Sequence, residues 1–380
     1  MSESERLAIL GPSPPDRGGI ARETSLLAGE LARSGPVAYF GFSRKYPRWL
    51  DPRRFADADG AASPDSPRAD PVLDWRSPRS WRRTAEAIAA GDPGGIVVPW
   101  WTAFWAIPVR AVLLRLRRRA PAVRRVLLCH NVEDHEGGAL HRFLSLGAFF
   151  AADGFFVHSE SARRELARLQ PRKPVGVFPH PVVPVDLPEP EAARRRLGVA
   201  SPLVLFLGLV RRYKGVDLLI RAAPRIVRET GARIAIVGES FSDASDVERL
   251  WRDSEARADI LRRDAYVPEP EMADWLAACD AVVLPYREIV SSGMAARAIA
   301  AGRPMAAARV GSLGETVVPG KTGELFESGD AEGLARAVAE ILARGASAYR
   351  DGLAEAARAA TWPAYARALR EFVASLRGGA

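Results

Sequence analysis

The sequence has few cysteines and no long apolar run. Only Cys129 and Cys279 occur among its 380 residues, and they lie far apart, without the spacing of a metal site. This excludes a disulfide framework and indicates a reducing compartment. Residues 1–6 are polar, so we expect no signal peptide, and no uncharged apolar run reaches the ~18 residues that span a bilayer. We therefore expect a cytoplasmic protein.

Acidic residues are outnumbered by basic ones. The net charge is +8 at neutral pH, and arginine carries nearly all of the positive charge. This excess is compatible with an acidic ligand or an anionic surface. No nucleic-acid-binding motif stands out, so we do not expect nucleic acid as a partner. Arginines gather from Arg115 to Arg119, at the end of a helix predicted over 107–119. They form either a solvated helix end or a peripheral contact with anionic lipids on the inner face of the membrane.

The length exceeds what one typical core holds, so we expect two domains. A strand at 7–10 and another at 203–207 are each followed by a glycine-containing loop and a helix. That order is typical of a doubly wound α/β domain. The G-x-G-x-x-G fingerprint of dinucleotide-binding proteins is absent after the first strand. We predict a first domain over 1–181 that includes a last helix at 362–380, a proline-rich linker over 182–198 and a second domain over 199–361.

Short apolar runs and helical periodicity predict the other elements. Residues 43–74 show little periodicity and are predicted as a long loop. Trp100, Trp101 and Trp105 follow a strand end and either pack in the core or face a ligand cleft. Further strands are predicted over 37–42, 95–99, 126–129, 155–158, 175–178, 234–237 and 281–284, and further helices over 20–34, 80–90, 271–279, 331–343, 349–360 and 363–376.

The stretch from 281 to 304 is predicted to form a strand, a polar turn and a small-residue helix. Ser291, Ser292 and Gly293 then lie at the helix N-terminus, just before the helix at 294–301. Backbone N–H groups there have no partner within the helix, and the helix dipole adds partial positive charge. The turn is therefore either an anion site, suited to a phosphate, or an ordinary connection capped by serine.

Several motifs in this half resemble the nucleotide-sugar half of GT-B glycosyltransferases of the retaining, family-four type. They are the helix end at 298–304 (AIAAGRP), the segment at 311–317 (GSLGETV), and Gly320, Gly323 and Leu325. The resemblance implies two Rossmann-like doubly wound parallel-sheet domains that face a central cleft, with a C-terminal helix crossing back to the first domain. It also implies sugar transfer from a nucleotide-diphosphate donor to a hydroxyl on a glycan, a lipid-linked or a small-molecule acceptor. Polysaccharide, glycolipid or glycoconjugate synthesis is the expected setting.

The resemblance also assigns roles to individual residues. The diphosphate is expected to contact Arg211, Lys214 and the helix N-terminus, which would stabilise the charge that develops on the leaving group. With those cations in place, we expect no metal and no cofactor beyond the nucleotide sugar. His130, after the strand at 126–129, is expected to face the donor sugar, although it could instead be a buried structural histidine. The full set of expected site residues is Gly18, Gly19, His130, Arg211, Lys214, Gly238, Glu288, Ser291, Ser292, Gly293, Met294, Arg297 and Glu315.

The sequence departs from the family pattern at two acidic positions. The family's two glutamates, eight residues apart, fall here at Ile289 and Arg297. We expect Glu288, rather than Glu315, to contact the donor sugar. Arg297 cannot accept hydrogen bonds, so it would contact a phosphate or ribose oxygen or pair with an acid such as Glu288.

Two other functions remain open on this sequence. The chain could be a catalytically silent GT-B homologue that acts as a scaffold, or a sugar-nucleotide epimerase. If it is a transferase, the family's usual front-face substitution needs no protein nucleophile. Binding of a nucleoside diphosphate distinguishes the transferase from the scaffold.

Overall fold

The computed structural model describes residues 5–14, 16, 19–46, 66–132, 138–200, 202–241, 246–289 and 292–376. The chain divides into two compact units. The first contains residues 1–179 and 362–380, and the second contains residues 180–361.

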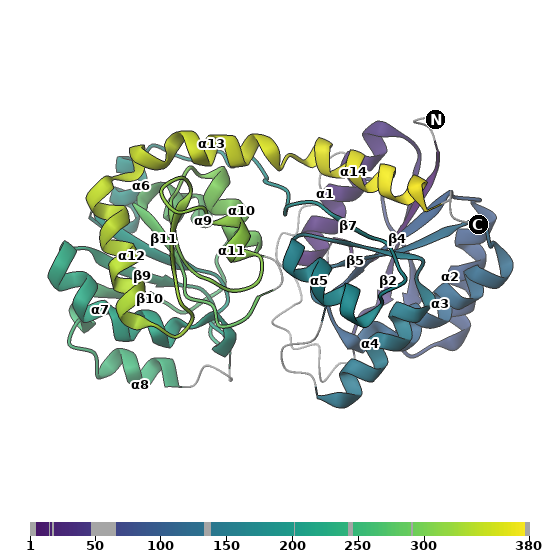
Figure 1. Cartoon of the computed structure of the whole chain (residues 1–380), viewed down its shortest axis with the longest axis horizontal. Coiled ribbons are helices and arrows are strands. Elements are labelled where there is room, and N and C mark those ends of the chain that lie inside the picture. The colour runs from purple at the N-terminus through teal and green to yellow at the C-terminus, as the bar shows by residue number, and fades with distance from the viewer. Residues whose placement is uncertain are drawn as a thin grey trace. The chain divides into compact units, whose positions relative to one another are not determined.

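A seven-stranded parallel sheet forms the centre of the first unit (Figure 1). Its order is β3-β2-β1-β4-β5-β6-β7, so the chain moves outward from β1 to β3 and then returns to β4. The direction of winding therefore reverses between β1 and β4. The strands are β1 (Leu7–Leu10), β2 (Val37–Arg44), β3 (Asp70–Asp74), β4 (Gly95–Trp100), β5 (Arg124–Cys129), β6 (Gly154–Val157) and β7 (Val175–Val177).

Helices cover this sheet, and the last helix of the chain is one of them. Helix α14 packs on α1, and the Arg370 guanidinium donates to the carbonyls of Glu5 and Leu31 at 2.9 and 2.8 Å. The expected return of the C-terminal helix to the first domain is thus confirmed (Figure 1). The helices are α1 (Gly19–Ser34), α2 (Pro78–Ala90), α3 (Ala106–Arg119), α4 (Ala139–Ala151), α5 (Glu160–Leu169) and α14 (Trp362–Ser375).

The second unit repeats the arrangement with a six-stranded parallel sheet. Its order is β10-β9-β8-β11-β12-β13, so winding reverses between β8 and β11. The strands are β8 (Leu203–Leu207), β9 (Arg233–Val237), β10 (Ile260–Arg263), β11 (Ala281–Leu284), β12 (Met305–Ala308) and β13 (Gly323–Phe326). The helices are α6 (Pro190–Leu197), α7 (Val216–Thr230), α8 (Asp246–Arg252), α9 (Glu269–Ala278), α10 (Gly293–Ala300), α11 (Leu313–Thr316), α12 (Ala331–Arg344) and α13 (Arg350–Ala359).

Both central strands of the second sheet are completely buried. β8 reads LVLFL and β11 reads AVVL, and every residue of both is buried. Continuous apolar runs of this kind belong to parallel strands that are covered on both faces. The predicted pair of doubly wound parallel-sheet domains is confirmed.

The loop predicted over 43–74 is wrong at its end, because Asp70–Asp74 form the edge strand β3 beside β2. Only Leu73 of β3 is buried, so the strand carries almost no apolar signal. Pro71 is tolerated because an edge strand leaves one side without hydrogen bonds. The middle of the predicted loop lies outside the described residues.

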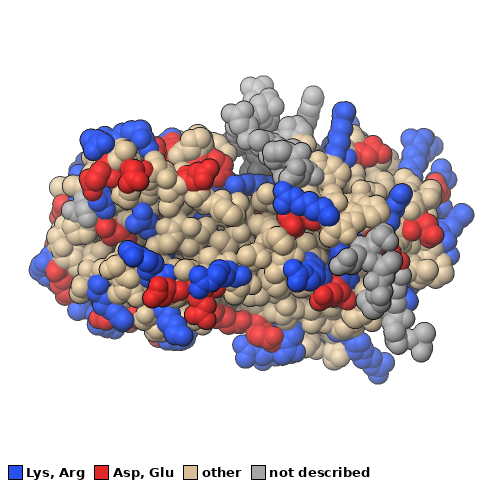
Figure 2. Space-filling view, turned by 90° about the horizontal axis from the view of Figure 1, so that it is seen from above, with Lys and Arg blue, Asp and Glu red and all other residues tan. Residues whose placement is uncertain are grey.

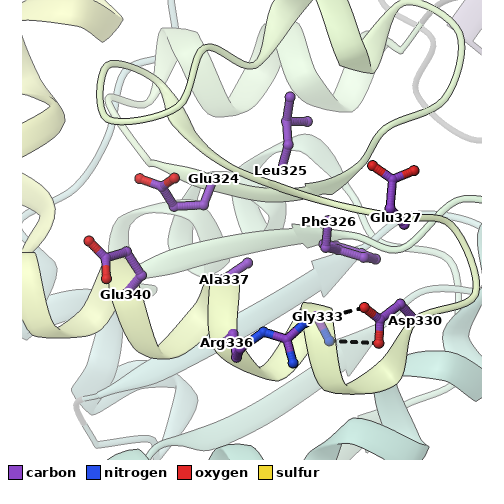
Figure 3. Close-up of a pocket in the computed structure, with 9 residues that line it drawn as sticks. All are labelled: Glu324, Leu325, Phe326, Glu327, Asp330, Gly333, Arg336, Ala337 and Glu340. Atoms are coloured by element: carbon purple, nitrogen blue, oxygen red, sulfur yellow. Dashed lines mark hydrogen bonds and ion pairs between the residues drawn. The ribbon is translucent and has the colours of Figure 1, made fainter.

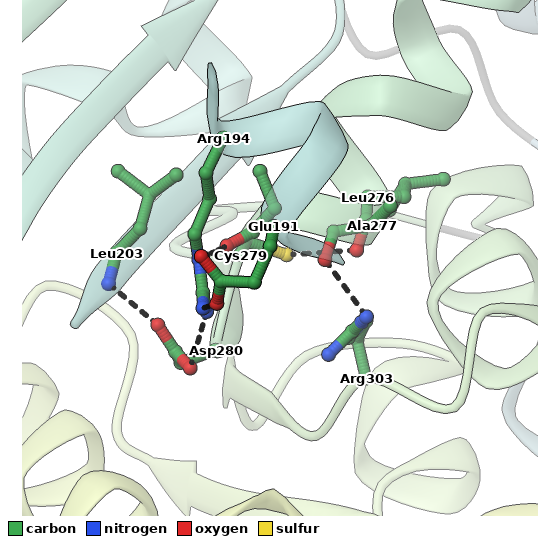
Figure 4. Close-up of polar contacts among 9 residues, drawn as sticks. Glu191, Arg194, Leu203, Leu276, Ala277, Cys279, Asp280 and Arg303 are labelled. Carbon is green, nitrogen blue, oxygen red and sulfur yellow. Dashed lines mark hydrogen bonds and ion pairs between the residues drawn. The ribbon is translucent and has the colours of Figure 1, made fainter. Parts of the chain in front are cut away.

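The segment at 182–198, predicted as a linker, belongs to the second unit and contains α6. Arg194 attaches α6 to the rest of the unit. Its guanidinium donates to the Ala278 carbonyl at 3.0 Å and to the Asp280 carboxylate at 3.1 Å (Figure 4). The other oxygen of Asp280 accepts the Leu203 N–H at 2.8 Å. One carboxylate therefore joins α6 to the starts of β8 and β11.

The tryptophans at and just beyond the end of β4 pack mainly in the core. Trp100 and Trp105 are buried, and Trp105 stacks on Phe42 with 4.1 Å between ring centroids. Trp101 remains half-buried. Of the two alternatives for these rings, core packing is the one observed for Trp100 and Trp105.

Charges of both signs are interspersed on the face drawn in Figure 2, among the residues shown in colour. Arg115, one of the arginines expected either at a solvated helix end or on a membrane, forms an ion pair with Glu86 of α2. Among the described residues, no helix has the length and apolar character needed to cross a bilayer.

Candidate functional site

The reversal between β8 and β11 places two loops at one edge of the second sheet. The loop at 208–215 follows β8, and the described residues 285–289 follow β11. In parallel α/β sheets, ligands bind outside the carboxyl ends of the strands where the winding reverses. This edge is therefore the candidate site.

Glycine allows these loops to approach one another closely. Gly215 has a φ of +68°, and a Cβ added there would lie 1.9 Å from the Pro285 carbonyl oxygen. Gly238, after β9, has a φ of +146°, and its Cβ would lie 1.9 Å from the Gly208 carbonyl oxygen. Only glycine fits at such positions. The loops after three neighbouring strands are thus in backbone contact.

Lys214 is half-buried between aromatic rings. Its ammonium lies 3.8 Å from the centroid of the Tyr286 ring and 5.2 Å from that of Tyr213. Burial lowers the pKa of Lys214, and Tyr213 acts weakly in the opposite direction. Among the residues that the structure describes, no carboxylate forms an ion pair with it. A cation in this environment is suited to an anionic ligand, because such a ligand would stabilise its charge.

Arg211 begins the same tight turn but points toward a different ring. The backbone N–H of Lys214 donates to the backbone carbonyl of Arg211 at 2.9 Å. The guanidinium of Arg211 lies 4.9 Å from the centroid of the Phe241 ring. The two predicted phosphate contacts therefore share one turn of the loop.

An ion pair that we did not predict holds this turn against the end of β11. The Arg287 guanidinium donates to the two Asp217 oxygens at 2.7 and 2.6 Å and to the Arg212 carbonyl at 2.9 Å. The Arg287 N–H donates to the Tyr213 carbonyl at 2.8 Å. The only signal in the sequence was an arginine three residues beyond a strand end, and its partner was not apparent.

We expect Asp217→Asn to lower the free energy of unfolding by about 1–2 kcal/mol at pH 7, allowing for partial solvent screening of the pair. Burial alone would raise the pKa of the Asp217 carboxyl, but the hydrogen bonds and charge of Arg287, with the charge of Arg221, hold it below its usual value. The Asp217 carboxylate therefore stabilises the folded state fully above the ordinary carboxyl pKa of about 4. This stabilisation is lost as the pH falls through the lowered pKa of Asp217. Urea unfolding of both proteins from pH 7 to pH 3 measures the difference.

A matched control is Glu160→Gln, which breaks the exposed pair with Arg163 and should change the unfolding free energy by less than about 0.5 kcal/mol. A difference between Asp217→Asn and wild type that grows below about pH 4 would contradict the assignment.

The predicted helix N-terminus is observed, with serine as its cap. Ser292 is buried, and its hydroxyl accepts the Ala295 N–H at 3.2 Å. Gly293 starts α10 and Met294 follows it; both are half-buried. A hydrogen bond also joins Ser292 to the buried Tyr286, whose pKa is raised by burial. The ring beside Lys214 is thus connected to the start of α10.

Ser291 and Gly18, both predicted to contact the donor, lie outside the described residues. Gly19 is described and begins α1.

Arg297 pairs with an acid, but not with the one expected. Its guanidinium donates to both oxygens of Glu269, at 2.9 and 2.7 Å. Glu269 starts α9, so the pair joins α9 to α10. We had considered Glu288 as the partner, and the sequence analysis missed Glu269 because periodicity does not show which helix starts meet.

Glu288 and Glu315 are both exposed. Glu288 directly follows Arg287 in the segment after β11, and Glu315 lies in the short helix α11. The expected preference for Glu288 as the sugar contact stays a prediction.

His130 is placed at the carboxyl end of β5 in the first unit. It is buried, its backbone N–H donates to the Trp100 carbonyl at 2.8 Å, and its ring Nδ1 lies 3.4 Å from Oε2 of Glu23 on α1. Its ring lies 5.4 Å from that of His158. Glu23, which we did not predict, orients the imidazole of His130. A carboxylate in the second turn of the helix after the first loop was the available signal.

A shallow hollow elsewhere on the second unit does not belong to this site. It lies between β13 and α12 and is rich in acids (Figure 3). These acids have local partners: Asp330 caps the Gly333 N–H at 2.8 Å, and Glu324 accepts from the Tyr349 hydroxyl at 2.9 Å. Within the described ranges, no group of three or more histidine, cysteine, aspartate or glutamate side chains could hold a metal ion.

Comparison with known proteins connects the second unit to a family. Residues 201–344 match the family model described as Glycosyl transferases group 1. A D-inositol 3-phosphate glycosyltransferase of Thermobispora bispora is 32% identical over 205 residues, which are 50% of this chain and 48% of that protein. The chain spans about half the length of the curated relatives it matches.

Solved structures show the same fold over nearly the whole chain. Sucrose-phosphate synthase from Thermosynechococcus elongatus has a TM-score of 0.72 at 20% identity and covers 99% of this chain and 100% of its own. HepE of Anabaena, solved with UDP-glucose, has a TM-score of 0.71 at 16% identity and covers 98% of this chain and 100% of its own. Residues 201–344 thus match the family Glycosyl transferases group 1, and the two Rossmann-like units of the chain have the fold of the GT-B glycosyltransferases.

Proposed function

We propose that the chain is a retaining glycosyltransferase that moves a sugar from a nucleoside-diphosphate donor to a hydroxyl acceptor. The observation that carries the proposal is the position of Lys214: a half-buried cation over the Tyr286 ring, at the edge where ligands bind in such sheets. A leaving diphosphate is the anionic group that fits it. Arg211, in the same turn, would add a second positive charge.

The chemistry follows from where charge develops. As the glycosidic bond breaks, its electron pair passes to the diphosphate oxygen, and the fixed cation stabilises that oxygen more in the transition state than in the ground state. The backbone N–H groups at the start of α10 would contribute in the same way. The acceptor hydroxyl attacks the anomeric carbon from the side on which the diphosphate leaves and passes its proton to the departing phosphate oxygen, so the anomeric configuration is retained and no protein nucleophile is needed. We propose that neither a metal nor a further cofactor takes part.

The acceptor and setting are proposals as well. The first relatives are named for D-inositol 3-phosphate, and one structural neighbour was solved with UDP-glucose. We therefore propose UDP-sugars as the first donors and a polyol phosphate as the first acceptor to test, alongside glycan and lipid-linked acceptors. The protein would act in the cytoplasm, in polysaccharide, glycolipid or glycoconjugate synthesis, with a peripheral contact to the membrane.

Calorimetric titration with UDP and with GDP tests the proposal. We expect one of them to bind at micromolar strength, about 8 kcal/mol, and to bind less tightly to Lys214→Ala. A folded protein that binds neither nucleotide would contradict it. If Lys214→Ala binds the nucleotide as tightly as wild type does, the anion site lies elsewhere.

A catalytically silent scaffold is the second candidate, and the Arg297–Glu269 pair is the observation that favours it. An arginine held by both carboxylate oxygens replaces the acid that family members use at this position. In the transferase, the Glu269 carboxylate would supply the missing acceptor oxygens from the neighbouring helix. Glu269→Gln should then weaken binding of a nucleoside diphosphate, and a scaffold without a nucleotide site would bind none.

A further inference from the structure

Helix α4 buries an apolar face in the first unit. Ala148 and Phe149 are buried, and the Phe149 ring meets those of Trp100 and Phe155 edge-on, with centroids 5.5 and 5.3 Å apart. These contacts account for one face of the helix. A helix that buries one apolar face is normally polar on its opposite, solvent-facing side.

The opposite face of α4 is also apolar. Leu140 is 68% exposed, Phe143 73% and Phe150 58%. Their spacing in the sequence keeps all three on one side of the helix. Ile107, at the start of the adjacent helix α3, is 55% exposed. These four are the majority of the seven large hydrophobic side chains exposed in the described part of the chain. A cluster of this kind marks an interaction surface.

Arginines of α3 lie along this apolar row. α3 and α4 pack against each other (Figure 1). A Cβ added at Gly147 would lie 3.5 Å from Cδ of Arg110, so the Arg110 stem runs over α4. The guanidinium of Arg117 lies 5.4 Å from the centroid of the exposed Phe150 ring. The apolar row is therefore bordered by positive charge.

No negative charge accompanies the arginines on these two helices. Their sequences, AIPVRAVLLRLRRR and ALHRFLSLGAFFA, contain six arginines and no aspartate or glutamate. Arg115 is turned toward Glu86 of α2. The partner of this surface must therefore be both apolar and anionic, which describes a membrane with acidic lipids more closely than a second copy of the same cationic surface.

We propose that the outer face of α4, together with Ile107, Arg110 and Arg117 of α3, binds an anionic membrane surface. This proposal rests on the proposed function, which includes a peripheral membrane contact, and it assigns that contact to the α3–α4 face without Arg115. The apolar side chains would enter the boundary between headgroups and acyl chains, while the guanidinium groups contact lipid phosphates. The Lys173 ammonium fixes the end of α4 by donating to three carbonyls, those of Phe149, Phe150 and Ala152, at 2.6, 2.9 and 2.6 Å.

Vesicle co-sedimentation tests this surface. We expect the wild-type chain to bind phosphatidylglycerol-containing vesicles and to bind pure phosphatidylcholine vesicles at least about tenfold more weakly. The double variant Leu140→Ser, Phe143→Ser should lose about tenfold or more in binding. Arg110→Glu, Arg117→Glu should bind the anionic vesicles no better than the neutral ones. Added salt should weaken wild-type binding, since it screens the arginines.

Matched controls lie in the second unit: Val318→Ser changes an exposed apolar residue and Arg228→Glu an exposed arginine, and both should bind like wild type. A double variant at α4 that binds as well as wild type, or a wild type that binds no vesicle, would overturn the proposal. So would a wild-type dimer that the α4 variant converts to a monomer without any vesicle binding. Nucleotide titration of the same variants reports on the transferase separately, since it needs no membrane.

Discussion

Lys214→Ala should slow sugar transfer roughly 30-fold to 1,000-fold, on the order of 2–4 kcal/mol of lost transition-state stabilisation. The ammonium lies 3.8 Å from the Tyr286 ring centroid, in the turn that contacts the end of β11. Its charge is thus fixed before the diphosphate begins to leave, and no reorganisation is needed when the bond breaks. Turnover of the donor selected from a panel of nucleotide sugars measures the effect.

Lys321→Ala is the matched control, because Lys321 is an exposed lysine of the same unit and its loss should leave turnover unchanged. Lys214→Arg keeps the positive charge but puts a larger group beside Tyr286, so we expect partial activity. Thermal unfolding establishes whether each variant is folded. If folded Lys214→Ala turns over the donor at the wild-type rate, Lys214 takes no part in the mechanism.

Gly215→Ala should lower the free energy of unfolding by about 2–5 kcal/mol and weaken nucleotide binding with it. Two effects destabilise the folded variant. Alanine disfavours the left-handed backbone conformation, and its Cβ would lie 1.9 Å from the Pro285 carbonyl oxygen. Relieving the overlap moves the turn that carries Arg211 and Lys214 away from β11. Urea unfolding and nucleotide titration measure the two effects.

Gly198→Ala separates these costs. Gly198 has nearly the same φ, +66° against +68°, but nothing lies within 4 Å of an added Cβ. It should therefore cost only about 1–2 kcal/mol and leave nucleotide binding unchanged. If Gly215→Ala were no more destabilising than Gly198→Ala, the close contact between the turn and Pro285 would be wrong.

In the first unit, sequence patterns predicted most of the strands but not the contacts between elements. Six of its seven strands were predicted from short apolar runs, and β1 begins and ends where expected, at Leu7 and Leu10. The edge strand β3 escaped prediction because Leu73 is its only buried residue. Glu23 beside His130 escaped it because a helix pattern does not reveal which strand end its first turns meet.

In the second unit, the sequence by itself located β8, β9 and β11, whereas β10, β12 and β13 were not predicted. β8 and β11 are buried from end to end, so their apolar runs, bounded by glycine, proline and aspartate, coincide with the strands. The glycine-containing turn and the small-residue helix after them follow from local chemistry. Together with the family motifs, this was sufficient to predict a candidate site at one edge of the sheet.

Only the tertiary structure decided which polar side chains meet at that edge. Arg287 pairs with Asp217, 70 residues away, and Arg297 with Glu269, 28 residues away. Periodicity determines which face of an element is buried, but it contains no information about which loop ends come together. That depends on the strand order β10-β9-β8-β11-β12-β13, which brings the loops after β8, β9 and β11 to one edge and so gives Lys214 its surroundings.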